Sequence, residues 1–158
     1  VPANKRIDDI ILNVDFPSLI LDYAGVSQPD SFQGKSFRSN LMLQTPSDWR
    51  KKMYYRYYAH AENRPSHMGI RTNQHKLIFY YGHPLGLKGT YTKKITPPAW
   101  EYYDLENDPM ELSNKYNNIE NKKIISQLKI DLLNLRNDLG DEKTDSDELK
   151  EILENHWE

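Results

Sequence analysis

Alternating and clustered apolar residues in the middle of the chain predict a small antiparallel sheet. The segment from Met68 to Tyr81 predicts two strands around a polar turn at residues 72–74, because β-branched and aromatic residues flank a short run of turn formers. Two further aromatic runs, Met53–Tyr58 and Trp100–Leu105, supply one strand on each side of this hairpin. We therefore expect about four strands.

A long amphipathic helix is predicted after the sheet. Between Ile119 and Leu139 the apolar residues recur at steps of three and four, which places them on one face of a helix. They are Ile124, Ile125, Leu128, Leu132, Leu135 and Leu139. Gly140 follows as the expected C-cap. We expect the stripe to pack on the sheet, with a partner helix as the alternative, so the fold class is α+β.

Local signals predict three shorter helices. Asp15 is a candidate N-cap for a helix that runs to Gly25. Asp108 and Glu111 have the spacing of a capping box, which predicts a helix after the last strand. Within the acidic end, residues 141–158, apolar residues recur at helical spacing and predict a final amphipathic helix.

Composition and charge narrow the classes of function. The chain has 158 residues and no cysteine, which excludes disulfides, thiolate metal sites and a cysteine nucleophile within it. Residues 1–100 carry 14 Lys and Arg against 7 Asp and Glu, whereas residues 101–158 carry 7 against 16. The basic part favours an anionic ligand, unless the acidic end balances it by packing on it. Neither a signal-peptide pattern nor an apolar run of membrane-spanning length is found.

The polar loop between the first two predicted strands holds the densest set of candidate chemistry. His60, Glu62, Arg64 and His67 lie within eight residues of one another, and Arg71 follows on the next strand. Two histidines with a carboxylate between them suggest a metal or acid–base site, ligand contact, or simply a polar surface. Because the spacing matches no recognised metal-ligand motif, no metal ligand and no catalytic residue is predicted here.

Short sequence motifs follow one another in a set order along roughly residues 7–140. They are Asp15-Phe16-Pro17, Gln33-Gly34-Lys35-Ser36-Phe37, Asp48-Trp49-Arg50, Tyr54-Tyr55-Arg56-Tyr57-Tyr58, His67-Met68-Gly69-Ile70-Arg71-Thr72, Lys76-Leu77-Ile78 and Tyr102-Tyr103-Asp104-Leu105-Glu106. This series resembles the C-terminal portion of type I sulfatases, the arylsulfatase-like members of the alkaline phosphatase superfamily. Within that family it looks like bacterial glycan sulfatases of the N-acetylglucosamine-6-sulfatase and mucin-desulfating type.

The resemblance implies that the catalytic groups of the parent enzyme lie outside this chain. The family's nucleophile is a formylglycine made from a Cys/Ser-x-Pro-x-Arg motif, which this sequence lacks. The family's calcium ligands lie upstream as well. Calcium and formylglycine are therefore implied for a full-length parent, and no cofactor is expected in this chain. The resemblance implies that residues 1–50 are the end of the catalytic α/β domain, residues 51–140 the C-terminal subdomain, and residues 141–158 an acidic helical tail.

The resemblance also implies a role for the polar loop. The family's C-terminal part supplies one wall of the substrate cleft, so we expect His60, Glu62, Arg64, His67 and Arg71 to contact a sulfated glycan. The expected partner is the upstream catalytic domain, and a periplasmic or secreted location is implied. The alternative is a free-standing module that binds an anionic glycan without catalysis. No nucleic-acid-binding signature is present, and the net charge is −2.

Overall fold

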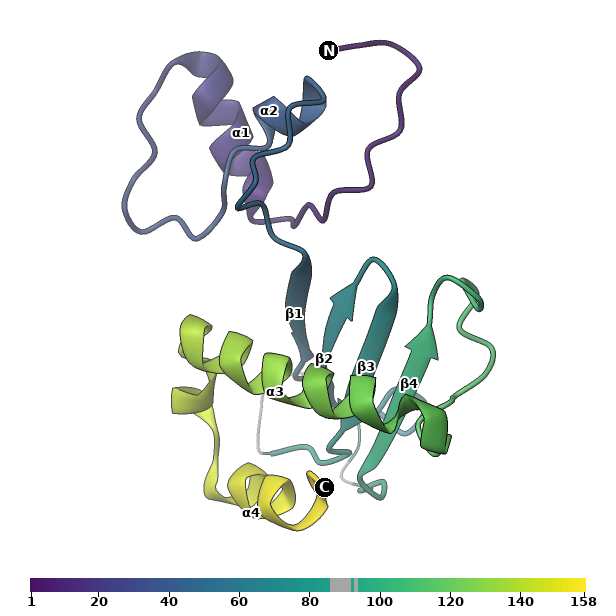
Figure 1. The fold of residues 1–158 in the computed structure, drawn as a ribbon. Helices are drawn as coiled ribbons and strands as arrows, with labels where there is room; N and C mark the ends of the chain where they lie inside the picture. The colour runs from purple at the N-terminus through teal and green to yellow at the C-terminus, as the bar shows by residue number, and fades with distance from the viewer. Residues whose placement is uncertain (86–91, 93) are drawn as a thin grey trace. The chain divides into compact units, whose positions relative to one another are not determined.

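The computed structural model describes residues 1–85, 92 and 94–158. The chain forms two compact units, Val1–Lys51 and Lys52–Glu158, which we call unit 1 and unit 2 and describe separately. Figure 1 shows the helices of unit 1 and the sheet and helices of unit 2.

Unit 1 contains two helices, α1 (Asp15–Ala24) and the short α2 (Arg38–Leu41). The predicted end of α1 is confirmed, because Gly25 takes the left-handed conformation at φ +67° that favours glycine. The prediction that Asp15 is an N-cap is wrong. Asp15 is the first residue of α1, and Val14 occupies the capping position.

The carboxylate of Asp15 instead joins distant parts of unit 1. It is fully buried and accepts hydrogen bonds from the backbone N–H groups of Leu12, at 2.7 Å, and Lys35, at 2.9 Å. The Arg50 guanidinium pairs with both of its oxygens. Burial alone would raise the pKa of Asp15, but the hydrogen bond from Arg50 and the two from the backbone outweigh it and lower the pKa.

Unit 2 is built on a four-stranded antiparallel sheet, as predicted. The strands are β1 (Lys52–Tyr57), β2 (His67–Thr72), β3 (His75–Tyr80) and β4 (Ala99–Asp104), and they lie in sequence order across the sheet. At the hairpin between β2 and β3, the Thr72 hydroxyl accepts hydrogen bonds from the N–H groups of Gln74, at 3.2 Å, and His75, at 2.8 Å. A threonine side chain therefore closes the turn.

The predicted long helix is also confirmed, as α3 (Lys122–Leu139) preceded by the 3₁₀ turn η1 (Ile119–Asn121). Figure 1 shows α3 lying across one face of the sheet. Ile125, Leu128 and Leu132 are buried there, while Leu139 at the end of the stripe stays 49% exposed. Gly140 ends the helix in the left-handed conformation, at φ +69°.

The acidic end of the chain belongs to the same core. It contains the 3₁₀ turn η2 (Asp141–Thr144) and α4 (Asp147–His156), which confirms the predicted final helix. Leu149 and Ile152 are buried in the core cluster with Phe79 and Trp100 from the sheet. The Ser146 hydroxyl caps α4 by accepting a hydrogen bond from the N–H of Leu149.

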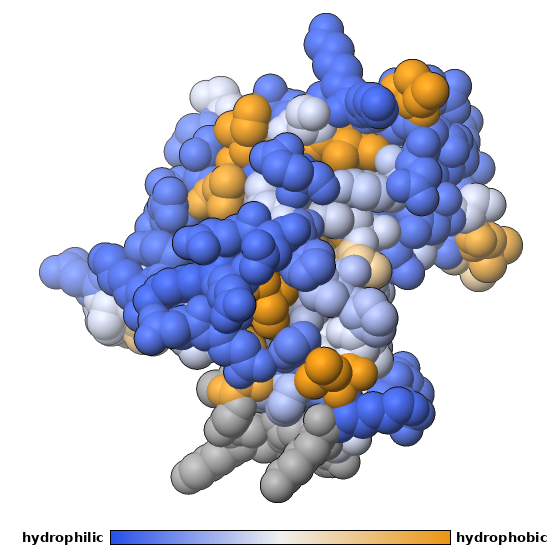
Figure 2. Space-filling view, turned by 90° about the horizontal axis from the view of Figure 1, so that it is seen from below, coloured by the Kyte–Doolittle hydropathy of each residue, from blue (hydrophilic) through white to orange (hydrophobic). Residues whose placement is uncertain are grey.

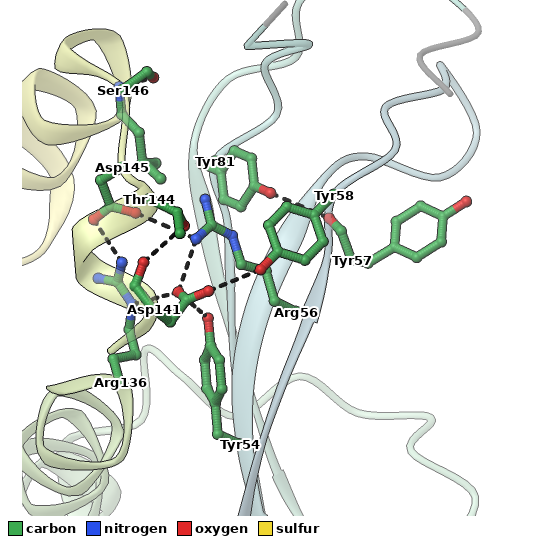
Figure 3. Close-up of polar contacts among 11 residues, drawn as sticks. Tyr54, Arg56, Tyr57, Tyr58, Tyr81, Arg136, Asp141, Thr144, Asp145 and Ser146 are labelled. Atoms are coloured by element: carbon green, nitrogen blue, oxygen red, sulfur yellow. Dashed lines mark hydrogen bonds and ion pairs between the residues drawn. The ribbon is translucent and has the colours of Figure 1, made fainter. Parts of the chain in front are cut away.

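Four buried charged side chains attach the acidic end to β1 and α3, and we call them the buried charge cluster (Figure 3). They are Arg56, Arg136, Asp141 and Asp145, each at most 9% exposed. Asp141 lies 2.7 Å from Arg56 and 3.3 Å from Arg136, and Asp145 lies 3.2 Å and 2.6 Å from the same two guanidiniums. Every charge in the cluster therefore faces two opposite charges.

The helix predicted after the last strand is absent. Residues 105–118 form turns and extended chain, and Glu111 has φ +55°, outside helical geometry. The Asp108 carboxylate accepts hydrogen bonds from the N–H groups of Leu112, at 3.0 Å, and Ser113, at 2.8 Å. The Asp108 side chain therefore caps a turn and not the N-terminus of a helix.

Exposed apolar side chains recur at helical spacing along α1, where Phe16, Ile20 and Tyr23 are 51%, 66% and 51% exposed. Figure 2 shows orange apolar patches among hydrophilic residues on one face of the molecule. Among the helices of the described residues, none combines the length and the apolar character needed to cross a bilayer.

Candidate functional site

The sheet has a second face, opposite the one that packs on α3. The antiparallel register and the alternation of side chains place Tyr55, Tyr57, His67, Arg71, Lys76, Ile78, Tyr80, Glu101 and Tyr103 on it. We call this set the second sheet face. It is rich in aromatic and charged groups, whereas the α3 face carries residues of the apolar core such as Met68 and Ile70.

His67 is surrounded by three tyrosines of the second sheet face. Its ring stacks on Tyr57 at 5.4 Å between centroids and 23° between planes, and it lies 5.0 Å from Tyr80 and 6.0 Å from Tyr55. Its Nδ1 lies 2.8 Å from the Pro65 carbonyl, so Nδ1 carries a proton and donates. The ring is therefore held in one orientation.

Gly69 is the reason that Tyr55 can lie so close to the sheet. A Cβ atom at this position would fall 2.6 Å from the Tyr55 hydroxyl and 2.7 Å from the Leu77 carbonyl oxygen. The missing side chain makes room for the Tyr55 ring over the backbone of β2.

The Arg64 guanidinium extends this aromatic surface. It lies 5.0 Å from the centre of the Tyr57 ring, which is the same ring that stacks on His67. Backbone hydrogen bonds in both directions between Ala61 and Arg64, at 3.1 and 3.0 Å, close a tight turn that presents the arginine. Arg64 is exposed, so its donors can reach a ligand that rests on the rings.

Burial lowers the pKa of His67, and the neighbouring Lys76 ammonium lowers it further, against the opposing effects of the Pro65 carbonyl and Glu101. We expect the imidazole to titrate below 6.5 when its side-chain resonances are followed by NMR. Since the neutral form is favoured in the folded chain, protonation opposes folding, and this contribution to stability is lost as the pH falls from 6.5 through the lowered pKa. A midpoint at or above 6.5 would contradict the burial of the ring.

His60 holds the loop together from inside. It is fully buried, and its Nδ1 accepts a hydrogen bond from the N–H of Ser66 at 3.3 Å. The ring proton is therefore on Nε2, which donates to the Lys94 carbonyl oxygen at 2.7 Å. Both nitrogens are used within the chain, and the ring has no exposed surface.

The two remaining predicted residues lie farther from His67. Glu62 is exposed and pairs with the Lys94 ammonium, which lowers the pKa of the carboxyl. Arg71 is on the same strand face as His67 but four residues away, roughly 13 Å along the strand. It lies 3.5 Å from Glu111. The structure therefore brings Arg64 next to the Tyr57–His67 stack and leaves Arg71 at the other end of β2.

The sequence reasoning named the polar residues of the site but not the individual tyrosines or Glu101. Tyr80 donates a hydrogen bond to Glu101 at 3.0 Å, and burial together with this carboxylate raises the pKa of Tyr80. The same two causes raise the pKa of Tyr103 to about 12. A signal was present for the tyrosines of β1, because a period of two places Tyr55 and Tyr57 on one face of that strand.

The described part of the chain contains no group of three or more His, Asp or Glu side chains arranged to hold a metal ion. Its side chains thus do not fit the calcium site that the family resemblance implies for a parent protein. The site offers aromatic rings, a guanidinium and a carboxylate, which are groups that can bind a ligand.

The fold and the order of motifs define a sulfatase C-terminal domain. The family model described as "N-sulphoglucosamine sulphohydrolase, C-terminal" matches residues 1–138, and the chain belongs to this family.

Two relatives that carry sulfatase names agree with this membership. An N-acetylglucosamine-6-O-sulfatase of Bacteroides thetaiotaomicron is 37% identical over 124 residues, which are 76% of this chain and 20% of the relative. An arylsulfatase of Clostridium perfringens is 30% identical over 125 residues, which are 79% of this chain and 22% of the relative. The chain thus spans about a fifth of the length of the relatives that it matches.

Solved structures share the fold. A protein in complex with its substrate D-glucosamine-2-N,6-O-disulfate is 34% identical with a TM-score of 0.65, covering 82% of this chain and 24% of that one. The phosphonate monoester hydrolase of Agrobacterium radiobacter has a TM-score of 0.57 at 18% identity, covering 78% of this chain and 24% of that one. The second likeness concerns the fold alone.

Proposed function

We propose that this chain is the C-terminal part of a sulfatase that hydrolyses sulfate esters on amino sugars, and that it forms one wall of the substrate cleft. The observation that carries the proposal is the 37% identity to an N-acetylglucosamine-6-O-sulfatase. The related protein that was solved with a disulfated glucosamine supports the same class of substrate.

In this proposal the groups that break the ester bond belong to residues upstream of the chain. The sequence lacks the Cys/Ser-x-Pro-x-Arg motif, so formylglycine and calcium would be supplied there, and the chain by itself would be inactive. Residues 1–50 would complete the catalytic α/β domain, residues 51–140 would form the C-terminal subdomain, and residues 141–158 the acidic tail. A periplasmic or secreted location of the parent is part of the same proposal.

The contacts on the second sheet face suggest how the chain would bind sugar. Arg64 lies beside the Tyr57–His67 stack and is exposed, so it can donate to hydroxyl or sulfate oxygens of a sugar that rests against the edge of these rings. Glu62 would lie at the rim and Arg71 farther along the strand. His60, which has no exposed surface, would take part by shaping the loop.

We expect Arg64→Ala, made in the whole protein that contains this chain, to lower kcat/KM on a 6-sulfated glucosamine by about 10- to 100-fold. This is the effect of losing a hydrogen bond to a charged group, roughly 1.5–3 kcal/mol. The kcat/KM on a small aryl sulfate, which does not extend to the sheet, should hardly change. Steady-state kinetics on the two substrates measures both values.

Lys123→Ala is the matched control, since it removes one exposed positive charge on α3. It should leave both substrates unaffected. Equal losses on the sugar and on the aryl sulfate in Arg64→Ala would count against sugar contact by this residue.

A further inference from the structure

Ser66 joins the loop that carries Arg64 to the chain that follows β3. It is fully buried. Its hydroxyl donates to the His83 carbonyl oxygen at 2.8 Å and accepts from the His83 N–H at 3.1 Å. Its carbonyl oxygen accepts from the N–H groups of Tyr81, at 3.1 Å, and Gly82, at 3.2 Å. The position of Ser66 is thus set by residues 81–83.

Helix α4 holds the other side of His83. The His83 Nδ1 lies 2.8 Å from a carboxylate oxygen of Glu148, in the first turn of α4. The helix is itself fixed, because Leu149 is fully buried and Ile152 is 7% exposed in the core of unit 2. Glu148 therefore projects from a rigid element onto His83.

The same serine also touches the candidate site. Its N–H donates to His60, whose ring shapes the Arg64 loop, and the next residue in the chain is His67 at the start of β2. A continuous series of contacts thus runs from Glu148 through His83 to Ser66 and on to both sides of the site.

We propose that α4 positions the sugar-binding residues, and that Glu148 is a positioning residue acting through His83 and Ser66. The inference rests on the proposed function for Arg64 and His67. It gives a role to a segment outside the family-model match, which ends at residue 138. Small displacements of binding groups are costly to recognition, so a fixed support behind the loop has a functional consequence.

The contact itself is tested in the 158-residue chain by amide hydrogen exchange. Glu148→Ala should speed exchange at His83 and Gly82 by about two- to five-fold, the effect of losing a partly exposed hydrogen bond. Glu151→Ala is the matched control, because it removes an exposed carboxylate from the same helix. Unchanged exchange at His83 and Gly82, or an equal change in the control, would overturn the proposal.

The consequence for recognition is tested in the whole protein. Glu148→Ala should raise KM on a 6-sulfated glucosamine by about two- to five-fold and leave kcat on a small aryl sulfate unchanged. If Glu148 acts through His83, the variant His83→Ala should show the same rise, and the double variant no more than either single one. Additive effects in the double variant, or no rise in KM in Glu148→Ala, would refute the positioning role.

The two proposals fail in different ways. If Arg64→Ala and His67→Ala leave sugar kinetics unchanged, the proposed site is wrong, while the exchange measurements still decide whether α4 orders the loop. If those variants weaken sugar hydrolysis but Glu148→Ala and His83→Ala do not, the site stands and the positioning role is refuted.

Discussion

Asp141→Ala is expected to lower the free energy of unfolding by about 3–5 kcal/mol, the cost of removing one partner from a buried ion pair. Asp141 accepts hydrogen bonds from Tyr54, at 2.7 Å, and Tyr58, at 2.8 Å, besides its contacts with two arginines (Figure 3). Without it, two buried guanidiniums share the single carboxylate of Asp145. Urea denaturation of the isolated chain measures the loss.

Asp138→Ala is the matched control, because Asp138 is an exposed carboxylate three residues earlier on α3. Its effect should stay within about 0.5 kcal/mol. Burial raises the pKa of Asp141, but the hydrogen bonds from the two tyrosines and the charge of Arg56 lower it by more. The contribution of Asp141 is therefore fully present above 3.8 and is lost as the pH falls through the lowered pKa. A variant as stable as the wild type at neutral pH would contradict this account.

Leu132→Ala should destabilise the chain by about 2–5 kcal/mol, since truncating a buried leucine removes transfer free energy and leaves a cavity. Leu132 is completely buried where α3 packs on the sheet. Leu133, its neighbour, is 38% exposed, so Leu133→Ala should cost much less. The midpoint of thermal or urea unfolding distinguishes the two variants. Similar losses would mean that α3 presents a different face to the sheet.

The sheet and the long helix could be predicted because their signals are periodic and local. The strands are runs of aromatic and β-branched residues on either side of a polar turn, and the apolar stripe from Ile124 to Leu139 keeps helical steps. Glycines at positions 25 and 140 mark helix ends because both adopt positive φ. Such signals do not depend on which distant residue a side chain meets.

The errors concern side chains whose partners are distant in sequence. Asp15 is a residue type that often caps helices, but its carboxylate accepts hydrogen bonds from the Lys35 N–H and the Arg50 guanidinium. No local sequence pattern reveals these two partners. Asp108 and Glu111 fit a capping box. In the structure, however, Glu111 pairs with Arg71 and Lys76 across the second sheet face, and no helix forms.

The candidate site was predictable as a region but not in its geometry. The polar loop and His67 were visible as a cluster of chemistry-bearing residues. That His60 would be buried, with Ser66 and Lys94 as its partners, depends on contacts 6 and 34 residues away. The stacking of Tyr57 on His67 likewise depends on the register between β1 and β2, which the sequence does not state.

The boundary of the family model has a consequence for anyone who shortens this protein. A chain cut after residue 138 would keep every residue that the family model matches and yet lose Asp141 and Asp145, the only carboxylates that face Arg56 and Arg136 among the described ion pairs. It would also expose the apolar surface that α4 covers. The end of the family-model match therefore falls inside unit 2.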